Sequence, residues 1–76
     1  MSETTLTILA SSIGSQIFVR LKGGKEFRGK LKSYDQHLNI VLEDAEELRQ
    51  NGEPKKHGLI LIRGDSIVLI SPVPKS

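Results

Sequence analysis

The chain has 76 residues, which predicts one domain, 1–76, with no separate catalytic or regulatory module. It has no cysteine, and its two histidines, His37 and His57, lie far apart, so disulfides and the usual four-ligand zinc spacing are excluded. A domain this small buries only about 60% of the surface that its unfolded chain exposes, so we expect oligomerisation to supply extra burial.

The net charge is only +2, but the charges are unevenly distributed. Residues 20–32 carry six basic side chains against one acid, and residues 43–53 carry five acids against one arginine. The basic run suits phosphate, although a solvated exterior of two strands explains it equally well. The acidic stretch either recruits a basic partner or keeps the outer surface soluble, and we favour solubility.

Nothing in the sequence indicates membrane insertion or export. No segment approaches the ~20 apolar residues that span a bilayer, and residues 1–5 lack a signal-peptide pattern. We therefore expect a soluble, cytoplasmic protein.

The first predicted element is a short amphipathic helix over residues 4–13. Leu6, Leu9, Ala10 and Ile13 recur at helical spacing, and Gly14 suits the left-handed residue that follows a helix. The period then changes from 3.6 to 2, which marks the start of an all-β body.

Two half-buried strands are predicted at residues 16–22 and 25–34, joined by a tight turn at Gly23-Gly24. Gly29 falls in phase with the buried face of the second strand. A missing side chain there lets a strand bend sharply or another backbone approach closely.

Three further strands are predicted at 37–45, 57–63 and 66–71, with an exposed connection at 46–56 that contains Asn51-Gly52 and Pro54. The last two strands are apolar on both faces, which one chain with a single short helix can hardly cover. We infer that another subunit covers the remainder. The alternative is that the helix and the interior of the sheet suffice.

No arrangement of residues indicates an enzyme. Polar residues interrupt the strand pattern in two clusters instead, at residues 34–39 and 62–66. Alternation places His37 and Asn39 on one strand face, with Leu38 toward the core, and Arg63-Gly64-Asp65 forms a turn between two apolar strands. An imidazole and a guanidinium could sandwich a base, and an Asn amide could bond its edge. Each cluster alone is also compatible with ordinary turn residues.

Together, these segments resemble the Sm and Sm-like (LSm) protein family, and the resemblance covers nearly the whole chain. Residues 19–43, VRLKGGKEFRGKLKSYDQHLNIVLE, are similar to the first Sm motif, with Gly29, Asp35 and Asn39 in place. Residues 59–72, LILIRGDSIVLISP, are similar to the second. Two motifs in the right order and strand phase are more specific than either alone.

The resemblance implies an N-terminal helix on a five-stranded, strongly bent antiparallel sheet, a small open barrel. It also implies a ring, usually of seven subunits, in which the fourth and fifth strands of neighbours pair. Six positions carry over as an RNA-binding site at the inner rim, for uridine-rich single strands: Asp35, His37, Asn39, Arg63, Gly64 and Asp65. The His37 and Arg63 positions would stack a uracil and the Asn39 position would bond its edge. No cofactor is implied, and other RNA-processing proteins are candidate partners.

An amide that flipped would accept cytosine as readily as uracil. We therefore hypothesise that Asp65, or a neighbouring backbone group, fixes the orientation of Asn39. The chain is most similar to an archaeal homo-oligomeric member, with a subunit of a mixed eukaryotic ring as an alternative. Two other readings stay open: a structural ring whose main partners are proteins, and a small barrel that binds structured RNA through the strand at residues 25–32.

Overall fold

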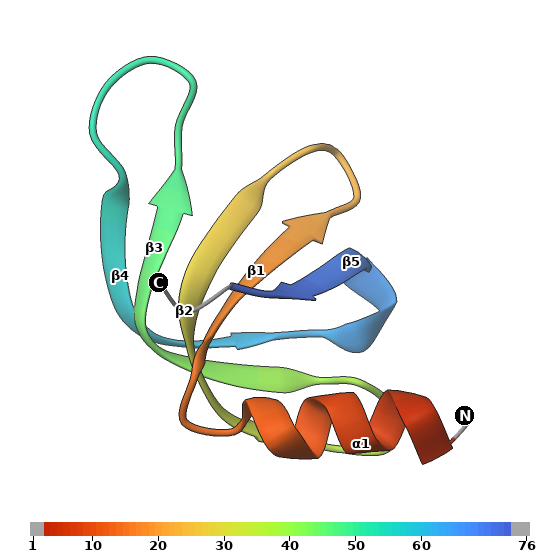
Figure 1. The fold of residues 1–76 in the computed structure, drawn as a ribbon. Coiled ribbons are helices and arrows are strands. Elements are labelled where there is room, and N and C mark those ends of the chain that lie inside the picture. The colour runs from red at the N-terminus through yellow and green to blue at the C-terminus, as the bar shows by residue number, and fades with distance from the viewer. Residues whose placement is uncertain (1–2, 74–76) are drawn as a thin grey trace.

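The structure, a computed structural model, describes residues 3–73 and shows a helix followed by a bent five-stranded sheet (Figure 1). The elements in chain order are α1 (Glu3–Ser12), β1 (Gln16–Leu21), β2 (Glu26–Tyr34), β3 (Ile40–Leu48), β4 (Lys55–Ile62), a short 3-10 helix η1 (Gly64–Ser66) and β5 (Ile67–Pro72). The predicted fold class is therefore confirmed. The predicted domain span 1–76 extends beyond the described residues at both ends.

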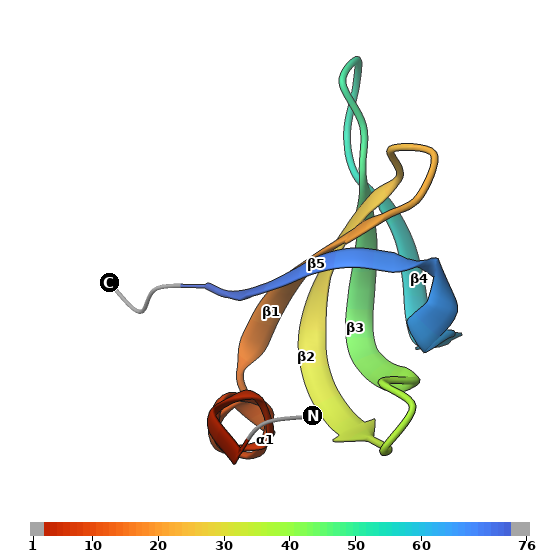
Figure 2. The same ribbon diagram turned by 90° about the vertical axis from the view of Figure 1, so that its right-hand side faces the viewer.

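All strand pairs are antiparallel, in the order β4-β3-β2-β1-β5, so β4 and β5 form the two edges of the sheet. The sheet bends so strongly that β5 runs across the direction of the other strands (Figure 2). Its concave side holds the core, whose fully buried side chains come from alternate positions of β1, β2 and β3: Ile17, Val19, Leu31, Ile40 and Leu42.

Gly29 permits the bend between β2 and β3. A Cβ there would lie 3.1 Å from the Cα of Ala45 and 3.1 Å from the carbonyl oxygen of Glu43. The β2–β3 register also shifts between Arg28 and Lys30, as expected where one strand bends over another. The predicted close approach at Gly29 is confirmed.

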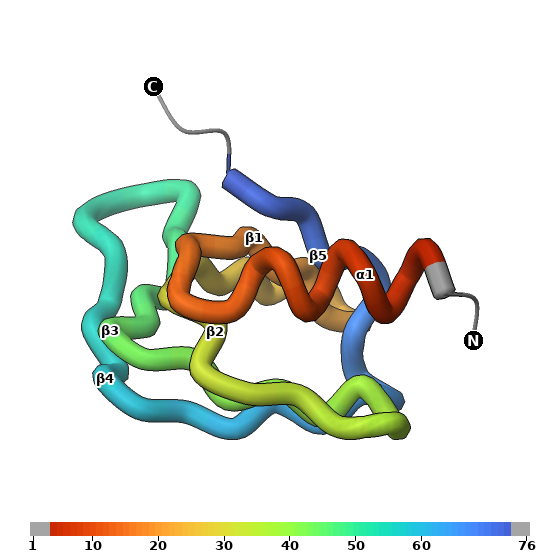
Figure 3. The backbone as a smooth tube through the Cα atoms, turned by 60° about the horizontal axis from the view of Figure 1, so that its bottom comes forward, coloured from red at the N-terminus to blue at the C-terminus, as the bar shows by residue number. Residues whose placement is uncertain are grey.

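The helix α1 lies at one end of the bent sheet (Figure 3). Backbone bonds hold the connection, since Gly14 N donates to Leu31 O at 2.8 Å and Leu31 N donates to Ser15 O at 3.0 Å. Gly14 has the expected left-handed conformation, with φ at 83°. The predicted apolar stripe is only partly correct: Leu9 is buried, but Leu6 and Ile13 are 40% and 44% exposed.

Three predicted strand boundaries were wrong. The third strand does not begin at residue 37, because residues 35–39 form a loop in which Leu38 is left-handed, with φ at 62°. The β3–β4 hairpin is also longer than predicted, since β3 runs to Leu48 and β4 begins at Lys55. Opposite charges face each other across it, Glu46 opposite Lys56 and Glu47 opposite Lys55, and such pairs stabilise strands even in a charged segment.

Large apolar side chains on the two edge strands are exposed to solvent. Leu59 and Leu61 on β4 are 65% and 66% exposed, and Val68 on β5 is 61% exposed. The alternative that the helix and the sheet interior cover both faces of these strands is therefore wrong. Among residues 3–73, no helix is long and apolar enough to cross a membrane.

Candidate functional site

The loop of residues 35–39, the Asp35 loop, is organised by one carboxylate. Asp35 Oδ1 accepts the backbone N–H of His37 at 2.8 Å and that of Asn39 at 3.0 Å. The backbone closes as well, because Leu38 N donates to Asp35 O at 3.0 Å and Asp35 N donates to Asn39 O at 3.1 Å. These bonds hold Leu38 in a left-handed conformation that costs a side-chain-bearing residue about 1–3 kcal/mol. The prediction that His37 and Asn39 share a strand face is therefore wrong, because both lie in this loop.

The second segment, residues 63–65, forms the Arg63 turn and contacts the Asp35 loop directly. Gly64 N donates to Asn39 Oδ1 at 2.8 Å across 25 positions of sequence. A Cβ on Gly64 would collide with His37 O and lie 2.8 Å from the carbonyl carbon of Leu38. Only glycine allows this approach, so the structure brings together the two segments that the sequence analysis singled out.

The side-chain amide of Asn39 is fixed at both ends. Its Nδ2 donates to Asp35 Oδ2 at 3.0 Å, while its Oδ1 accepts from Gly64 N. A carboxylate only accepts and a backbone N–H only donates, so the pair permits a single orientation of the amide. The hypothesis that Asp65 fixes Asn39 was wrong, because Asp35 does so. The alternative of a neighbouring backbone group is confirmed by Gly64.

The planar side chains near this amide are open to solvent. Arg63 donates to Asp65 Oδ2 at 3.1 Å, and these two side chains are 75% and 65% exposed. His37 is also exposed. An exposed ion pair of this kind contributes at most about 1 kcal/mol to stability, so the guanidinium remains free to meet a ligand.

The carboxyl group of Asp35 is stabilised in its charged form. The hydrogen bond from the Asn39 side chain, and then those from the backbone of His37 and Asn39, lower the pKa of its carboxyl below the ordinary value. The group is therefore ionised near neutral pH and acts only as an acceptor.

Three of the six basic side chains in residues 20–32 are paired with acids. Arg20 pairs with Glu26 at 2.9 Å, Arg28 with Glu46 at 3.5 Å and Lys32 with Glu43 at 3.5 Å. Two of these acids belong to the acidic stretch, and a third, Glu47, bonds His57 at 3.0 Å. The acidic stretch therefore has partners within the chain, and the convex face of β2 offers less free positive charge than its sequence indicates.

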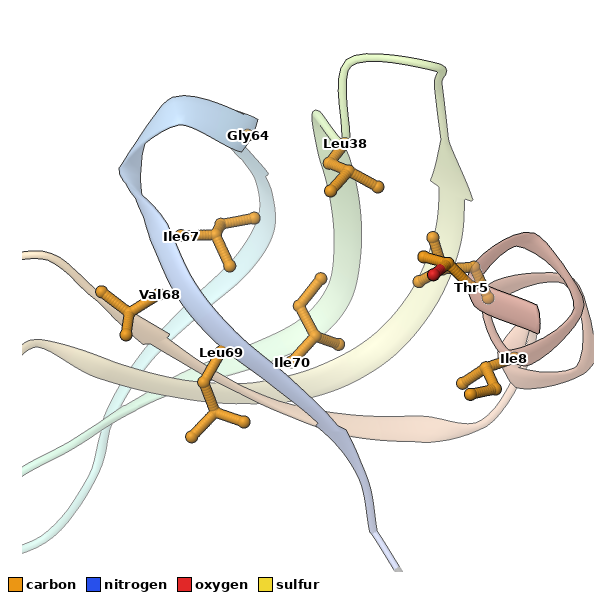
Figure 4. A pocket seen from close by; sticks show the side chains of 9 residues that line it. Thr5, Ile8, Leu38, Gly64, Ile67, Val68, Leu69 and Ile70 are labelled. Carbon is orange, nitrogen blue, oxygen red and sulfur yellow. The ribbon is translucent and has the colours of Figure 1, made fainter. Parts of the chain in front are cut away.

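A cavity of about 290 Å³ lies beside the site, between α1 and β5, and was not anticipated from the sequence. Leu38 and Gly64 reach it from the site, and Thr5 and Ile8 reach it from the helix (Figure 4). Its other lining residues are Leu9, Ile67, Val68, Leu69 and Ile70. Leu38, predicted to point into the core, lines this cavity instead. Among residues 3–73, no three His, Cys, Asp or Glu side chains are grouped to hold a metal ion.

The chain is similar to known proteins over nearly its whole length. Residues 7–72 match the LSM domain family, a span that contains both the Asp35 loop and the Arg63 turn. The chain belongs to this family. An Archaeoglobus fulgidus protein named as snRNP Sm-like is 53% identical over 75 residues, covering 97% of this chain and 96% of its own.

Two solved structures of LSM-related proteins resemble the whole domain. The SmAP1 heptamer of P. aerophilum has a TM-score of 0.91 and 44% identity, covering 99% of this chain and 100% of its own. The Sm protein of Pyrococcus abyssii, solved in complex with a uridine heptamer, has a TM-score of 0.83 and 46% identity, covering 90% of this chain and 96% of its own. The predicted membership of the Sm-like family is therefore confirmed, and its archaeal relatives are among the similar proteins.

Proposed function

We propose that this LSM domain, spanning residues 1–76, forms a ring of seven copies and binds short single-stranded uridine-rich RNA at its inner rim. The protein would act in RNA processing, RNA stability or ribonucleoprotein assembly in the cytoplasm, without catalysis and without a cofactor. The observation that carries this proposal is the Asn39 amide held in one orientation by Asp35 and Gly64.

The fixed amide is complementary to the edge of uracil. Asn39 Oδ1 has a second lone pair to accept the N3–H of the base, and Nδ2 has a second hydrogen to donate to its C4 carbonyl. Cytosine has an acceptor at N3 and a donor at C4, so both contacts would fail. Edge recognition of this kind distinguishes bases on single-stranded RNA.

His37 and Arg63 would supply affinity by stacking on the two faces of the base. Stacking contributes on the order of 1–3 kcal/mol per base and is nearly indifferent to base identity. Their exposure leaves both side chains accessible to a ligand. The similar Pyrococcus abyssii protein, which was solved with a uridine heptamer, supports this use of the site.

The edges of the sheet support the ring. Within the described residues, β4 pairs only with β3 and β5 only with β1, so each has an unpaired outer edge. An antiparallel pair between β4 of one copy and β5 of the next would satisfy these edges and cover Leu59, Leu61 and Val68. Repeated head-to-tail, such a contact closes a ring. The similar P. aerophilum protein was solved as a heptamer, which supports an assembly of seven copies. A ring offers several sites to one strand, so affinity should rise steeply with RNA length.

The decisive experiment is fluorescence anisotropy with labelled oligo-uridine and oligo-cytidine of equal length at one fixed salt concentration. Electrostatic binding alone treats the two strands alike, so a clear uridine preference is the expected result. Asn39→Ala should abolish the preference. Gln36→Ala, in the same loop and exposed, is the matched control and should retain it.

Other outcomes would favour other functions. If both strands bind equally and the affinity falls as the salt concentration rises, the site is only a basic surface. Preference for duplex RNA would support a small barrel that binds structured RNA through residues 25–32. Absence of binding to any RNA would support a ring whose main partners are proteins.

A further inference from the structure

Within residues 3–73, all but one of the lysines and arginines that lack an ion pair lie at one end of the molecule; the exception is Lys30 in the middle of β2. Within residues 3–73, acids pair with Arg20, Arg28, Lys32 and Arg63 but not with the remaining cations. Five of those remaining are exposed in or beside the turns of the hairpins β1–β2 and β3–β4, and we call them the hairpin-end cations: Lys22, Lys25, Arg49, Lys55 and Lys56. Both hairpins project from the end of the sheet opposite α1 (Figure 1).

Nearby acids neutralise this end only in part. Glu26 and Glu46 already pair with Arg20 and Arg28, whereas the partner of Glu47 is a histidine, His57, which is charged only if it is protonated. Of the acids on the two hairpins in the described part of the chain, Asp44 and Glu53 have no ion pair, so at most three acids, with Glu47, offset the five hairpin-end cations. The hairpin end therefore carries a local excess of positive charge that the net charge of +2 conceals.

Hairpin-end cations from both hairpins lie near one carboxyl group, that of Glu47. After the His57 hydrogen bond, the charges of Lys25 and Arg49 both contribute to lowering the pKa of the Glu47 carboxyl. Lys55 lies opposite Glu47 in the β3–β4 register. Cations from the two hairpins thus lie around Glu47 instead of being scattered over the surface.

This surface is continuous with the candidate RNA site. Lys22 N donates to Ser66 O at 2.8 Å, and Leu21 pairs with Ile67, so the turn end of the β1–β2 hairpin adjoins η1. Gly64, which contacts the Asp35 loop, begins η1. A strand that leaves a base stacked on Arg63 would therefore meet Lys22 first, and then Lys25 at the end of the hairpin.

We propose that the hairpin-end cations form a second, sequence-independent binding surface for the phosphate backbone of the RNA that flanks the uridine tract. Four of the five are lysines, whose compact charges on flexible stems suit phosphates without fixing base identity. The continuity with the uridine site favours RNA over an acidic protein as the occupant. This inference rests on the proposed function and extends it from a short uridine tract to a longer strand.

The test compares a uridine heptamer with the same heptamer carrying ten cytidines on its 5′ or 3′ side. We expect one flanked strand to bind on the order of tenfold more tightly than the heptamer at low salt, with a steeper dependence on salt, because each neutralised phosphate adds about 0.7 to the slope. The triple variant Lys25→Gln, Lys55→Gln and Lys56→Gln should lose this gain and keep its affinity for the bare heptamer.

The matched control is Lys30→Gln, compared with Lys25→Gln. Both variants remove one positive charge per subunit. Lys30 is also exposed and without an ion pair among the described residues, but it lies in the middle of β2, away from the hairpin ends. Equal losses in the two variants, or no gain from either flank, would overturn the inference. If uridine and cytidine heptamers bind alike, the proposed function fails. The phosphate-binding surface would still be supported if the unmodified protein binds a cytidine 17-mer and the triple variant does not.

Discussion

Asp35 holds the side chain of Asn39 by a 3.0 Å hydrogen bond from Nδ2 to Oδ2, while its other oxygen accepts two backbone N–H groups of the same loop. One carboxylate therefore shapes the loop and also orients the amide that we assign to base recognition. Because a carboxylate cannot donate, the flipped amide, which would favour cytosine, is excluded.

The first prediction concerns Asp35→Asn, which keeps the shape of the side chain and introduces a donor. The Asn39 amide could then flip, so the preference for oligo-uridine over oligo-cytidine should fall about tenfold, corresponding to about 1.4 kcal/mol. Anisotropy titrations with both strands measure the ratio. Asp44→Asn makes the same chemical change on β3, away from the site, and should preserve it. An unchanged ratio in Asp35→Asn would show that Asp35 does not set selectivity.

The second prediction concerns the contact between the Arg63 turn and the Asp35 loop. Gly64→Ala places a methyl group against His37 O, so the two segments must separate. We expect a loss of about 1–3 kcal/mol of unfolding free energy, together with weaker uridine binding. Urea denaturation at fixed protein concentration measures the first effect. Ser66→Ala in the same short helix serves as the control, and equal stability of the two variants would mean that the approach of the backbones is not required.

Much of the sheet could be predicted because alternation is a local signal. Ile17, Val19 and Leu31 recur at the period of a half-buried strand, and all three are fully buried. Gly29 stood in phase with them, which indicated a bend. The two polar clusters were also found, because polar residues interrupt an otherwise apolar pattern.

The geometry of the Asp35 loop could not be predicted in the same way. Leucine has no preference for the left-handed conformation that Leu38 adopts, and only the hydrogen bonds of Asp35 impose it. Alternation therefore extended the third strand three residues too far. The partner of the Asn39 amide likewise depends on which carboxylate the folded loop brings near. The sequence does not show this, and so the expectation was Asp65 or a neighbouring backbone group where the structure has Asp35 and Gly64.

The third prediction concerns the ring. Leu61 on the edge strand β4 is 66% exposed, and a neighbouring β5 would cover it in the proposed assembly. Leu61→Asp would bury an unpaired charge there, so we expect the oligomer to dissociate into smaller species. Light scattering after size-exclusion chromatography measures the mass. Ile13→Asp, at an exposed position directly after α1, is the control and should leave the mass unchanged. An intact oligomer in Leu61→Asp would exclude the β4 edge as the interface.

The fourth prediction concerns acid stability through Glu47 and His57. The His57 hydrogen bond lowers the pKa of the Glu47 carboxyl in the folded protein, so folding favours its ionised form. Its contribution to stability is therefore complete above the ordinary carboxyl range and is lost as the pH falls through the lowered pKa. Between about pH 6 and pH 3, Glu47→Gln should lose less unfolding free energy than the unmodified protein, measured by urea denaturation at one protein concentration. Glu53→Gln lacks such a bond within the described residues and should follow the unmodified protein. If both variants show the same pH dependence, the Glu47–His57 contact does not contribute to acid sensitivity.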